Sequence, residues 1–203
     1  MMIVQCRPDE QHRFYQHIKD VLDFLLAFVL LILFLPLLLL IALIIRFDSL
    51  GLPIYCQQRV GRRGRLFTIY KFRTMQADAP CLSTEEMQRL GYDPSTRVGS
   101  FLRKSSLDEL PQLLNILCGD MSCIGPRPAL PTQDFVNTRR AELRADIVRP
   151  GITGLAQVMG RDALDDETKV QYDREYCQHL SFTQDIKVVF LTIMVVISAR
   201  GVK

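Results

Sequence analysis

An uninterrupted apolar run near the start of the chain constrains the fold more than any other feature. No charged residue occurs from Phe24 to Ile45, although charged residues make up 23% of the sequence. A helix needs about 20 apolar residues to cross the ~30 Å hydrocarbon core of a bilayer. A soluble core helix of that length would carry a polar stripe. The sequence therefore predicts a membrane-associated helix at residues 19–46.

A proline lies near the middle of this helix. Proline removes a backbone donor and clashes with the preceding turn, so Leu35 and Pro36 mark an expected bend. Two geometries remain open: a kinked helix that spans the bilayer, and a re-entrant helix that enters and returns on the same side. Basic residues flank both ends, Lys19 and Arg46, so loop charge does not distinguish the two ends. This charge pattern favours the re-entrant form.

The rare side chains narrow the possible chemistry. The six cysteines include no CxxC pair, which favours a reduced domain facing the cytosol over a disulfide framework or a zinc site. Only three histidines occur, so a nucleophile activated by histidine has little basis in this sequence.

The segment after the apolar run predicts an antiparallel β-hairpin. Ile54–Gln58 and Leu66–Phe72 have strand character, and Gly61 and Gly64 provide the turn between them. The polar stretch that follows, Gln76–Asp93, reads as a loop or a short surface helix.

The hairpin is strongly basic. Its cations occur without an acidic residue among them: Arg59, Arg62, Arg63, Arg65, Lys71 and Arg73. Such cations suit either anionic lipid headgroups or a bound phosphate. We favour phosphate binding for Lys71 and Arg73 and leave the turn arginines open. Nucleic acid is not expected as a partner, because the net charge is only +3 and no aromatic stacking pattern accompanies the cations.

Two adjacent carboxylates, Asp108 and Glu109, occur where a helix is expected to begin. Ser106 and Glu109 have the spacing of a capping box, whereas Pro111 would suit the first position of a helix that starts later. Either register places Asp108 near a helix N-terminus, where the dipole and free amides keep a carboxylate ionised. In isolation the pair reads as a cap.

Two loops beyond this helix carry further cations and donors. Arg127 lies between two prolines in "GDMSCIGPRPAL". The later stretch "VRPGITGLAQVMGR" combines glycines with Arg149, Thr153 and Arg161. Backbone amides and guanidiniums in such loops can surround an anion. Together with the acidic pair and the basic hairpin, the loops indicate a site for phosphate and a divalent cation.

Four motifs in order, "KFRTM", "SLDELPQLLNIL", "GDMSCIGPRP" and "RPGITGLAQVMGR", carry a family resemblance. With the proline-containing apolar segment before them, the chain resembles the bacterial sugar transferases from about Lys19 to Ser198. These are small monotopic phosphoglycosyl transferases, also called undecaprenyl-phosphate sugar-1-phosphate transferases. The resemblance implies transfer of a sugar 1-phosphate from a UDP-sugar to a polyprenyl phosphate, with release of UMP. It also implies that Asp108 is the nucleophile, forming an aspartyl-phosphosugar, and that Asp108 and Glu109 hold Mg²⁺.

The resemblance also implies an α+β fold at the cytoplasmic face of the bacterial inner membrane. Residues 1–18 would form an N-terminal extension, residues 19–46 a re-entrant helix embedded in one leaflet, and residues 47–203 a mostly helical cytosolic catalytic domain with the hairpin and interfacial helices. The family bends its membrane helix at a Ser-Pro pair, and this chain has Leu35-Pro36 there. The sugar, the oligomeric state and the role of the first residues stay open.

The last helix has two possible environments. Ser181 and Gln184 have capping-box spacing, and Gly201 is the expected stop. The uncharged section Val188–Ala199 is too short to span a bilayer. The helix therefore either packs on the domain core or lies partly among lipid headgroups.

Overall fold

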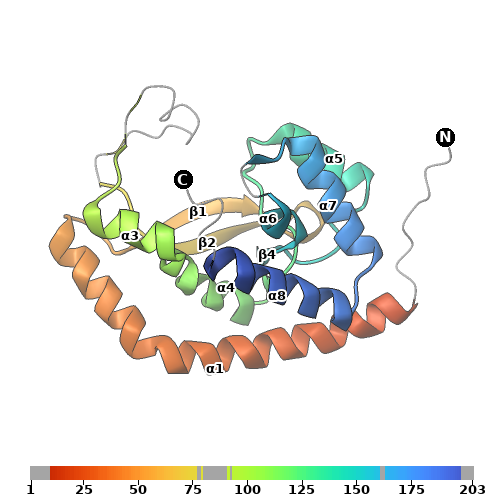
Figure 1. The fold of residues 1–203 in the computed structure, drawn as a ribbon, viewed down its shortest axis with the longest axis horizontal. Helices are drawn as coiled ribbons and strands as arrows, with labels where there is room; N and C mark the ends of the chain where they lie inside the picture. The colour runs from red at the N-terminus through yellow and green to blue at the C-terminus, as the bar shows by residue number, and fades with distance from the viewer. Residues whose placement is uncertain (1–9, 77–78, 80–90, 92, 161–162, 198–203) are drawn as a thin grey trace.

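The computed structural model describes residues 10–76, 79, 91, 93–160 and 163–197. The predicted fold class is confirmed: the described chain is mostly helical, with one small antiparallel sheet and a long apolar helix at its N-terminal end (Figure 1). Its elements are α1 (Glu10–Asp48), β1 (Ile54–Val60), η1 (Arg62–Gly64), β2 (Leu66–Phe72), α3 (Arg97–Ser105), η2 (Leu107–Gln112), α4 (Leu113–Leu117), β3 (Ser122–Ile124), α5 (Asp134–Glu142), β4 (Gly151–Thr153), α6 (Leu155–Met159), α7 (Asp166–Gln178) and α8 (Phe182–Ile197).

Helix α1 continues through Pro36 and changes direction along its length, turning toward α3 at its C-terminal end (Figure 1). It begins at Glu10, so residues 10–18 of the predicted extension lie in the same helix. Both parts of the helix pack on the domain. Ala27 joins the core cluster of the hairpin and α4, and Ile41 and Ile45 pack with Phe72 and Leu102.

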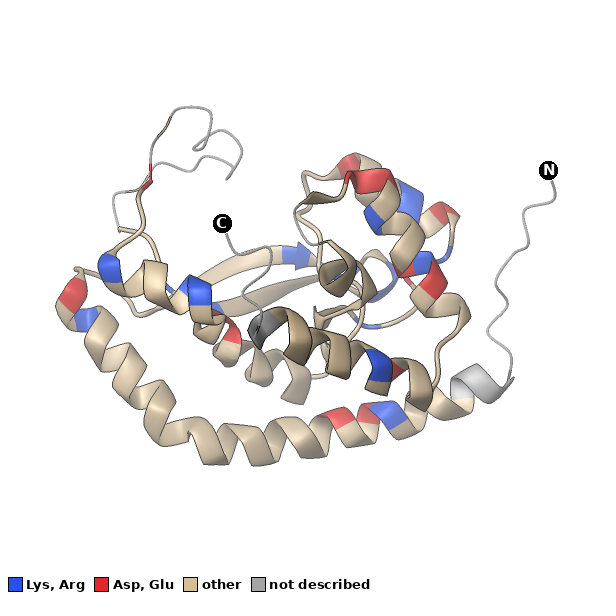
Figure 2. Ribbon diagram, in the orientation of Figure 1, with Lys and Arg blue, Asp and Glu red and all other residues tan. Residues whose placement is uncertain are grey.

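The outward face of α1 is apolar. Figure 2 shows a long uncharged middle between charged ends. The stretch Phe14–Asp48 is long and apolar enough to cross a membrane by length and composition. Large apolar side chains exposed along this stretch include Val21, Leu25, Val29, Ile32, Leu33, Leu39 and Leu43. A surface of this kind suggests membrane association.

The predicted hairpin is confirmed. Strands β1 and β2 pair antiparallel from Ile54↔Phe72 to Val60↔Leu66, so β1 runs two residues further than the sequence indicated. Its inner face carries Phe67 and Ile69 onto α4. The turn contains Arg63 with φ 55° and Gly64 with φ 74°, the left-handed conformation that glycine adopts without strain.

The two cationic loops are brought together by a second, parallel ladder that the sequence did not predict. Strand β3 pairs with β4 at Ser122↔Gly151 and Ile124↔Thr153. The backbones approach so closely that a Cβ on Gly151 would collide with the amide nitrogen of Gly125. Glycine is therefore required where the Arg127 and Arg149 segments meet.

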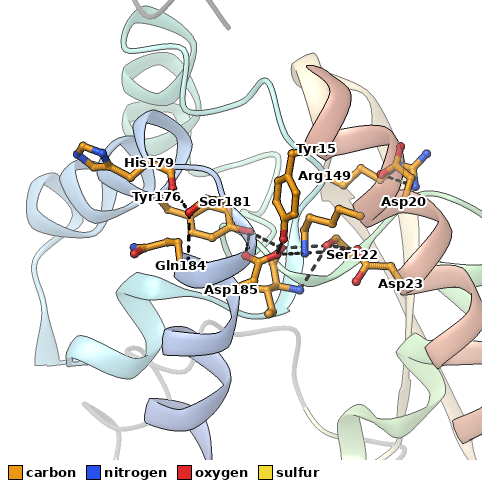
Figure 3. A network of polar contacts seen from close by, with 12 residues as sticks. Tyr15, Asp20, Asp23, Ser122, Arg149, Tyr176, His179, Ser181, Gln184 and Asp185 are labelled. Carbon is orange, nitrogen blue, oxygen red and sulfur yellow. Dashed lines mark hydrogen bonds and ion pairs between the residues drawn. The ribbon is translucent and has the colours of Figure 1, made fainter. Parts of the chain in front are cut away.

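A buried polar network joins α1 to the rest of the domain (Figure 3). Lys19 pairs with Asp185 of α8 at 2.7 Å and with Asp23 at 3.5 Å. Tyr15 and Tyr176 both donate to Asp185, at 2.7 Å and 2.6 Å. Because the charged groups of this network are buried, each requires its partners, and the network fixes the start of α1 against α8.

Helix α8 packs on the domain core, the first of the two environments considered for it, and leaves an apolar face exposed. The Ser181 hydroxyl accepts from the Gln184 amide at 3.3 Å, as the predicted cap requires. Asp185 and Val188 are buried against the core, while the opposite face exposes Phe182, Ile186, Val189, Phe190, Ile193 and Met194. The predicted stop at Gly201, and most of the predicted loop Gln76–Asp93, lie outside the described residues.

Candidate active site

The acidic pair lies in a short 3-10 helix, and the predicted capping box is wrong. Ser106 ends α3 in the left-handed conformation, with φ 57°, and its side chain makes no capping hydrogen bond. Helix η2 follows directly, with Asp108 and Glu109 in its first turn and Pro111 inside it. The chain reverses at Ser106 instead of starting a helix from an extended residue, so the hydroxyl does not cap the helix as an N-cap side chain does. The Glu109 carboxylate meets the hairpin at Lys71.

Glu109 is held by two cations from distant segments. Its Oε1 accepts from Lys71 Nζ of β2 at 2.7 Å and from Arg127 Nη1 and Nη2 at 3.4 Å. Only 17% of the side chains of Glu109 and Lys71 is exposed. Burial alone would raise the pKa of Glu109, but Arg127 and Lys71 outweigh it and lower the pKa to about 2. Glu109 is therefore a permanent anion at this site.

Asp108 differs sharply from its neighbour. Burial, followed by the negative charge of Glu109, raises the pKa of Asp108 to about 6, against the opposing effects of Lys71, Arg103 and Arg127. The ionised form expected of this carboxylate therefore still predominates at neutral pH, although burial makes the proton harder to remove than at an exposed carboxyl. Two adjacent carboxyls with separated pKa values are typical of catalytic pairs.

Two further arginines lie near the pair and were not selected from the sequence. Arg103 on α3 acts electrostatically on Asp108 and donates from Nε to Thr74 Oγ1 at 2.9 Å. Arg59 on β1 donates to the Pro128 carbonyl at 3.2 Å and lies close enough to Arg127 for the two charges to interact. Strand alternation from Tyr55, which pairs with Lys71, would have placed Arg59 on the same face as that lysine.

The other predicted phosphate-binding residues have partners elsewhere. Arg73 donates to the carbonyls of Leu50 and Ser49 at 2.8 Å and 2.9 Å, just past the end of α1. Arg149 pairs with Asp20 of α1 at 3.2 Å.

Thr153 exchanges a hydroxyl contact of 2.8 Å with Thr192 of α8. Arg161 lies outside the described residues. Of the predicted phosphate-binding residues, the contacts therefore join Lys71 and Arg127 to Glu109 of the acidic pair.

The residues fit a magnesium ion that is completed by its substrate. No group of three or more His, Cys, Asp or Glu side chains that could hold a metal occurs among the described residues. Mg²⁺ commonly takes only one or two carboxylates, with phosphate oxygens and waters as its other ligands. Asp108 and Glu109 supply that number, and the cation contacts of Glu109 described above all use Oε1.

The site and the fold together define a class of protein. A carboxyl of raised pKa, a permanent carboxylate and several cations form a site suited to phosphoryl transfer. The same domain carries a long apolar helix that suggests membrane association.

The chain belongs to the bacterial sugar transferase family, whose model matches residues 14–199. It is 43% identical over 182 residues to the UDP-glucose:undecaprenyl-phosphate glucose-1-phosphate transferase of Caulobacter vibrioides, covering 86% of this chain and 68% of that protein. It is 40% identical over 199 residues to the exopolysaccharide production protein ExoY of Rhizobium meliloti, covering 90% and 87%.

The chain is also 40% identical over 200 residues to the UDP-N-acetylgalactosamine-undecaprenyl-phosphate N-acetylgalactosaminephosphotransferase of Aeromonas hydrophila, covering 93% of this chain and 46% of that protein. Several of the curated relatives are thus much longer, and the chain spans less than half of their length.

Proposed function

We propose that this protein is a phosphoglycosyl transferase that moves a sugar 1-phosphate from a UDP-sugar to undecaprenyl phosphate, the initiating step of membrane glycoconjugate or polysaccharide assembly. The names of the Caulobacter and Aeromonas relatives support both substrates. The observation that carries the proposal is the pairing of Asp108 with Glu109 beside Lys71 and Arg127, with the two carboxyl pKa values far apart.

In the first step, an oxygen of ionised Asp108 attacks the β-phosphorus of the UDP-sugar. The bond from that phosphorus to the bridging oxygen breaks, UMP leaves with the electron pair, and an aspartyl-phosphosugar remains. Lys71 and Arg127 supply positive charge beside the reacting phosphate, and Glu109 holds both cations in place. A carboxylate nucleophile of this kind needs no histidine.

In the second step, a phosphate oxygen of the polyprenyl phosphate attacks the same phosphorus. The acyl phosphate bond breaks, the Asp108 carboxylate is restored, and the polyprenyl diphosphate sugar is released. Asp108 and Glu109 are the residues that would hold Mg²⁺, which would neutralise diphosphate charge and favour departure of UMP.

The acceptor phosphate lies at the headgroup level, so the site belongs at the water-lipid boundary. We place it at the cytoplasmic face, with α1 embedded in one leaflet. Both parts of α1 pack on one domain, through Ala27 before Pro36 and Ile41 after it. A helix that spanned the bilayer would carry one of these parts away from the domain, so the contacts favour the re-entrant form. The exposed apolar faces of α1 and α8 would enter the lipid.

The decisive experiment assays UMP release from a panel of UDP-sugars, with undecaprenyl phosphate in detergent and Mg²⁺ present. Asp108→Asn should abolish release, and mass spectrometry of wild-type protein with its donor should find the phosphosugar on residue 108. Asp134→Asn, which changes an exposed carboxylate in the first turn of α5, is the matched control and should stay active. Full turnover by Asp108→Asn would refute the proposal.

A further inference from the structure

Arg127, an exposed cation of the site, lies on a backbone segment that is held from two sides. On one side, β1 of the hairpin contacts the residues after it: Arg59 donates to the Pro128 carbonyl at 3.2 Å, and the Val60 amide donates to the Ala129 carbonyl at 2.9 Å. On the other side, Arg140 of α5 donates from Nη1 to the carbonyl of Arg127 itself, at 2.9 Å. The side chain of Arg127 is 51% exposed, so these backbone contacts do much to fix where it starts.

Arg140 is itself fixed by an acid from the next helix. Its Nε and Nη2 both donate to Asp173 Oδ2 of α7, at 2.9 Å and 2.6 Å. Asp173 is almost completely buried, with 1% of its side chain exposed, and Arg140 is 12% exposed. The planar guanidinium uses one edge for Asp173 and its remaining amino group for the Arg127 carbonyl, which the single amine of lysine cannot reproduce.

A role in stability alone does not account for this arrangement. Buried ion pairs contribute little more than well-packed apolar residues of the same size. Here the third donor is aimed at the backbone carbonyl of Arg127, a residue whose side chain reaches Glu109 Oε1 of the catalytic pair. Helices α5 and α7 lie side by side, away from α3 (Figure 1), so the contacts lead from the edge of the domain to the site.

We propose that Arg140, oriented by Asp173, is a positioning residue that sets the place of Arg127 and so the affinity of the site for a diphosphate. The contacts run from α7 through α5 and the Arg127 segment to Glu109. This inference rests on the proposed function, because the anion that Arg127 meets is taken to be the diphosphate of the donor.

The test compares three variants. Arg140→Lys keeps the positive charge beside Asp173 but removes the hydrogen bond to the Arg127 carbonyl. Arg140→Leu combined with Asp173→Leu removes both buried charges together, so neither is left unpaired. Such a double replacement of a buried ion pair is often neutral for stability, so this variant should stay folded. Arg139→Lys is the matched control, since Arg139 lies on the same helix and pairs with Glu142 and Glu167 but not with the Arg127 segment.

Two readouts are measured: kcat/KM for UMP release, and the Kd of UDP in the presence of Mg²⁺. Both Arg140 variants should lower kcat/KM and raise the Kd of UDP, each by about tenfold, because a small displacement of a positioning group costs this much or more. The loss should disappear when Arg127 is already Gln, since Arg140 then has nothing to position. Arg139→Lys should match wild type.

The outcomes separate the two proposals. The positioning role would be overturned if the Arg140 variants lost as much kcat/KM in the Arg127→Gln protein as in the wild type. It would also be overturned if UDP binding were unchanged in both Arg140 variants, even if catalysis is as proposed. A wild-type protein that binds UDP through Arg127 and Arg140 but releases no UMP from any UDP-sugar would overturn the proposed function and leave the positioning role standing.

Discussion

Asn115→Leu is expected to damage both the fold and the site, because this side chain joins the hairpin to the segment that bears the acidic pair. Asn115 lies in α4, seven residues after Asp108, and has 0% exposure. Its Nδ2 donates to the Thr68 carbonyl at 2.7 Å, and its Oδ1 accepts from the Tyr70 amide at 3.1 Å. Both partners belong to β2, in which Lys71 directly follows Tyr70.

The magnitude follows from the groups left behind. Leucine has nearly the shape of asparagine, so the cavity contribution is small, but one backbone amide and one carbonyl lose their partners. Each buried unpaired group costs about 1–3 kcal/mol, which gives about 4 kcal/mol for the two. For a chain of this size, 1 kcal/mol shifts Tm by about 2–4 °C, so the expected fall in Tm is roughly 8–16 °C.

Thermal unfolding of the detergent-solubilised protein measures the stability, and UMP release measures the site. Asn137→Leu is the control: its Nδ2 donates to one carbonyl, that of Leu130, at 2.9 Å in a half-buried position, so about 1 kcal/mol is expected. The surviving Asn115→Leu protein should also show reduced kcat/KM, because Lys71 is no longer held in register with Glu109. A Tm within about 2 °C of wild type would refute the assigned role of the two hydrogen bonds.

Three further predictions concern the charges of the site. Because the pKa of Asp108 is raised to about 6 and its ionised form attacks, kcat/KM at limiting Mg²⁺ should fall as the pH drops below about 6. Saturating Mg²⁺ should move this fall to lower pH. A kcat/KM that does not change across about pH 6 under either condition would contradict this. Lys71→Met should lower kcat/KM by about 10- to 100-fold, the value of one hydrogen bond between charged groups, and Lys71→Arg should recover part of the loss; equal rates for Lys71→Met and wild type would exclude Lys71 from the site. Arg149→Gln should cost under ~1 kcal/mol and leave the donor KM unchanged, since Arg149 forms a partly exposed pair with Asp20 at 3.2 Å; a rise in donor KM would instead return Arg149 to the phosphate site.

Local patterns in the sequence were sufficient for several elements. The uncharged run and Pro36 predicted a long apolar helix with a change of direction. Alternation and the glycines Gly61 and Gly64 predicted the hairpin, including its partner strands. These features depend on backbone preferences and on residues close in the chain, which a sequence displays directly.

The composition of the site depended on the tertiary structure. Lys71 meets Glu109 across 38 positions of sequence, and Arg140 meets Asp173 across 33. Arg73 looked equivalent to Lys71 in the sequence, yet its guanidinium is directed to the residues after α1.

The raised pKa of Asp108 likewise comes from burial and from the neighbouring charge of Glu109, which together outweigh the cations Lys71 and Arg103 that β2 and α3 place nearby. A side chain's charge state and partners are set by whatever the fold packs beside it. The sequence therefore determined which groups could act, and the packing decided which of them meet.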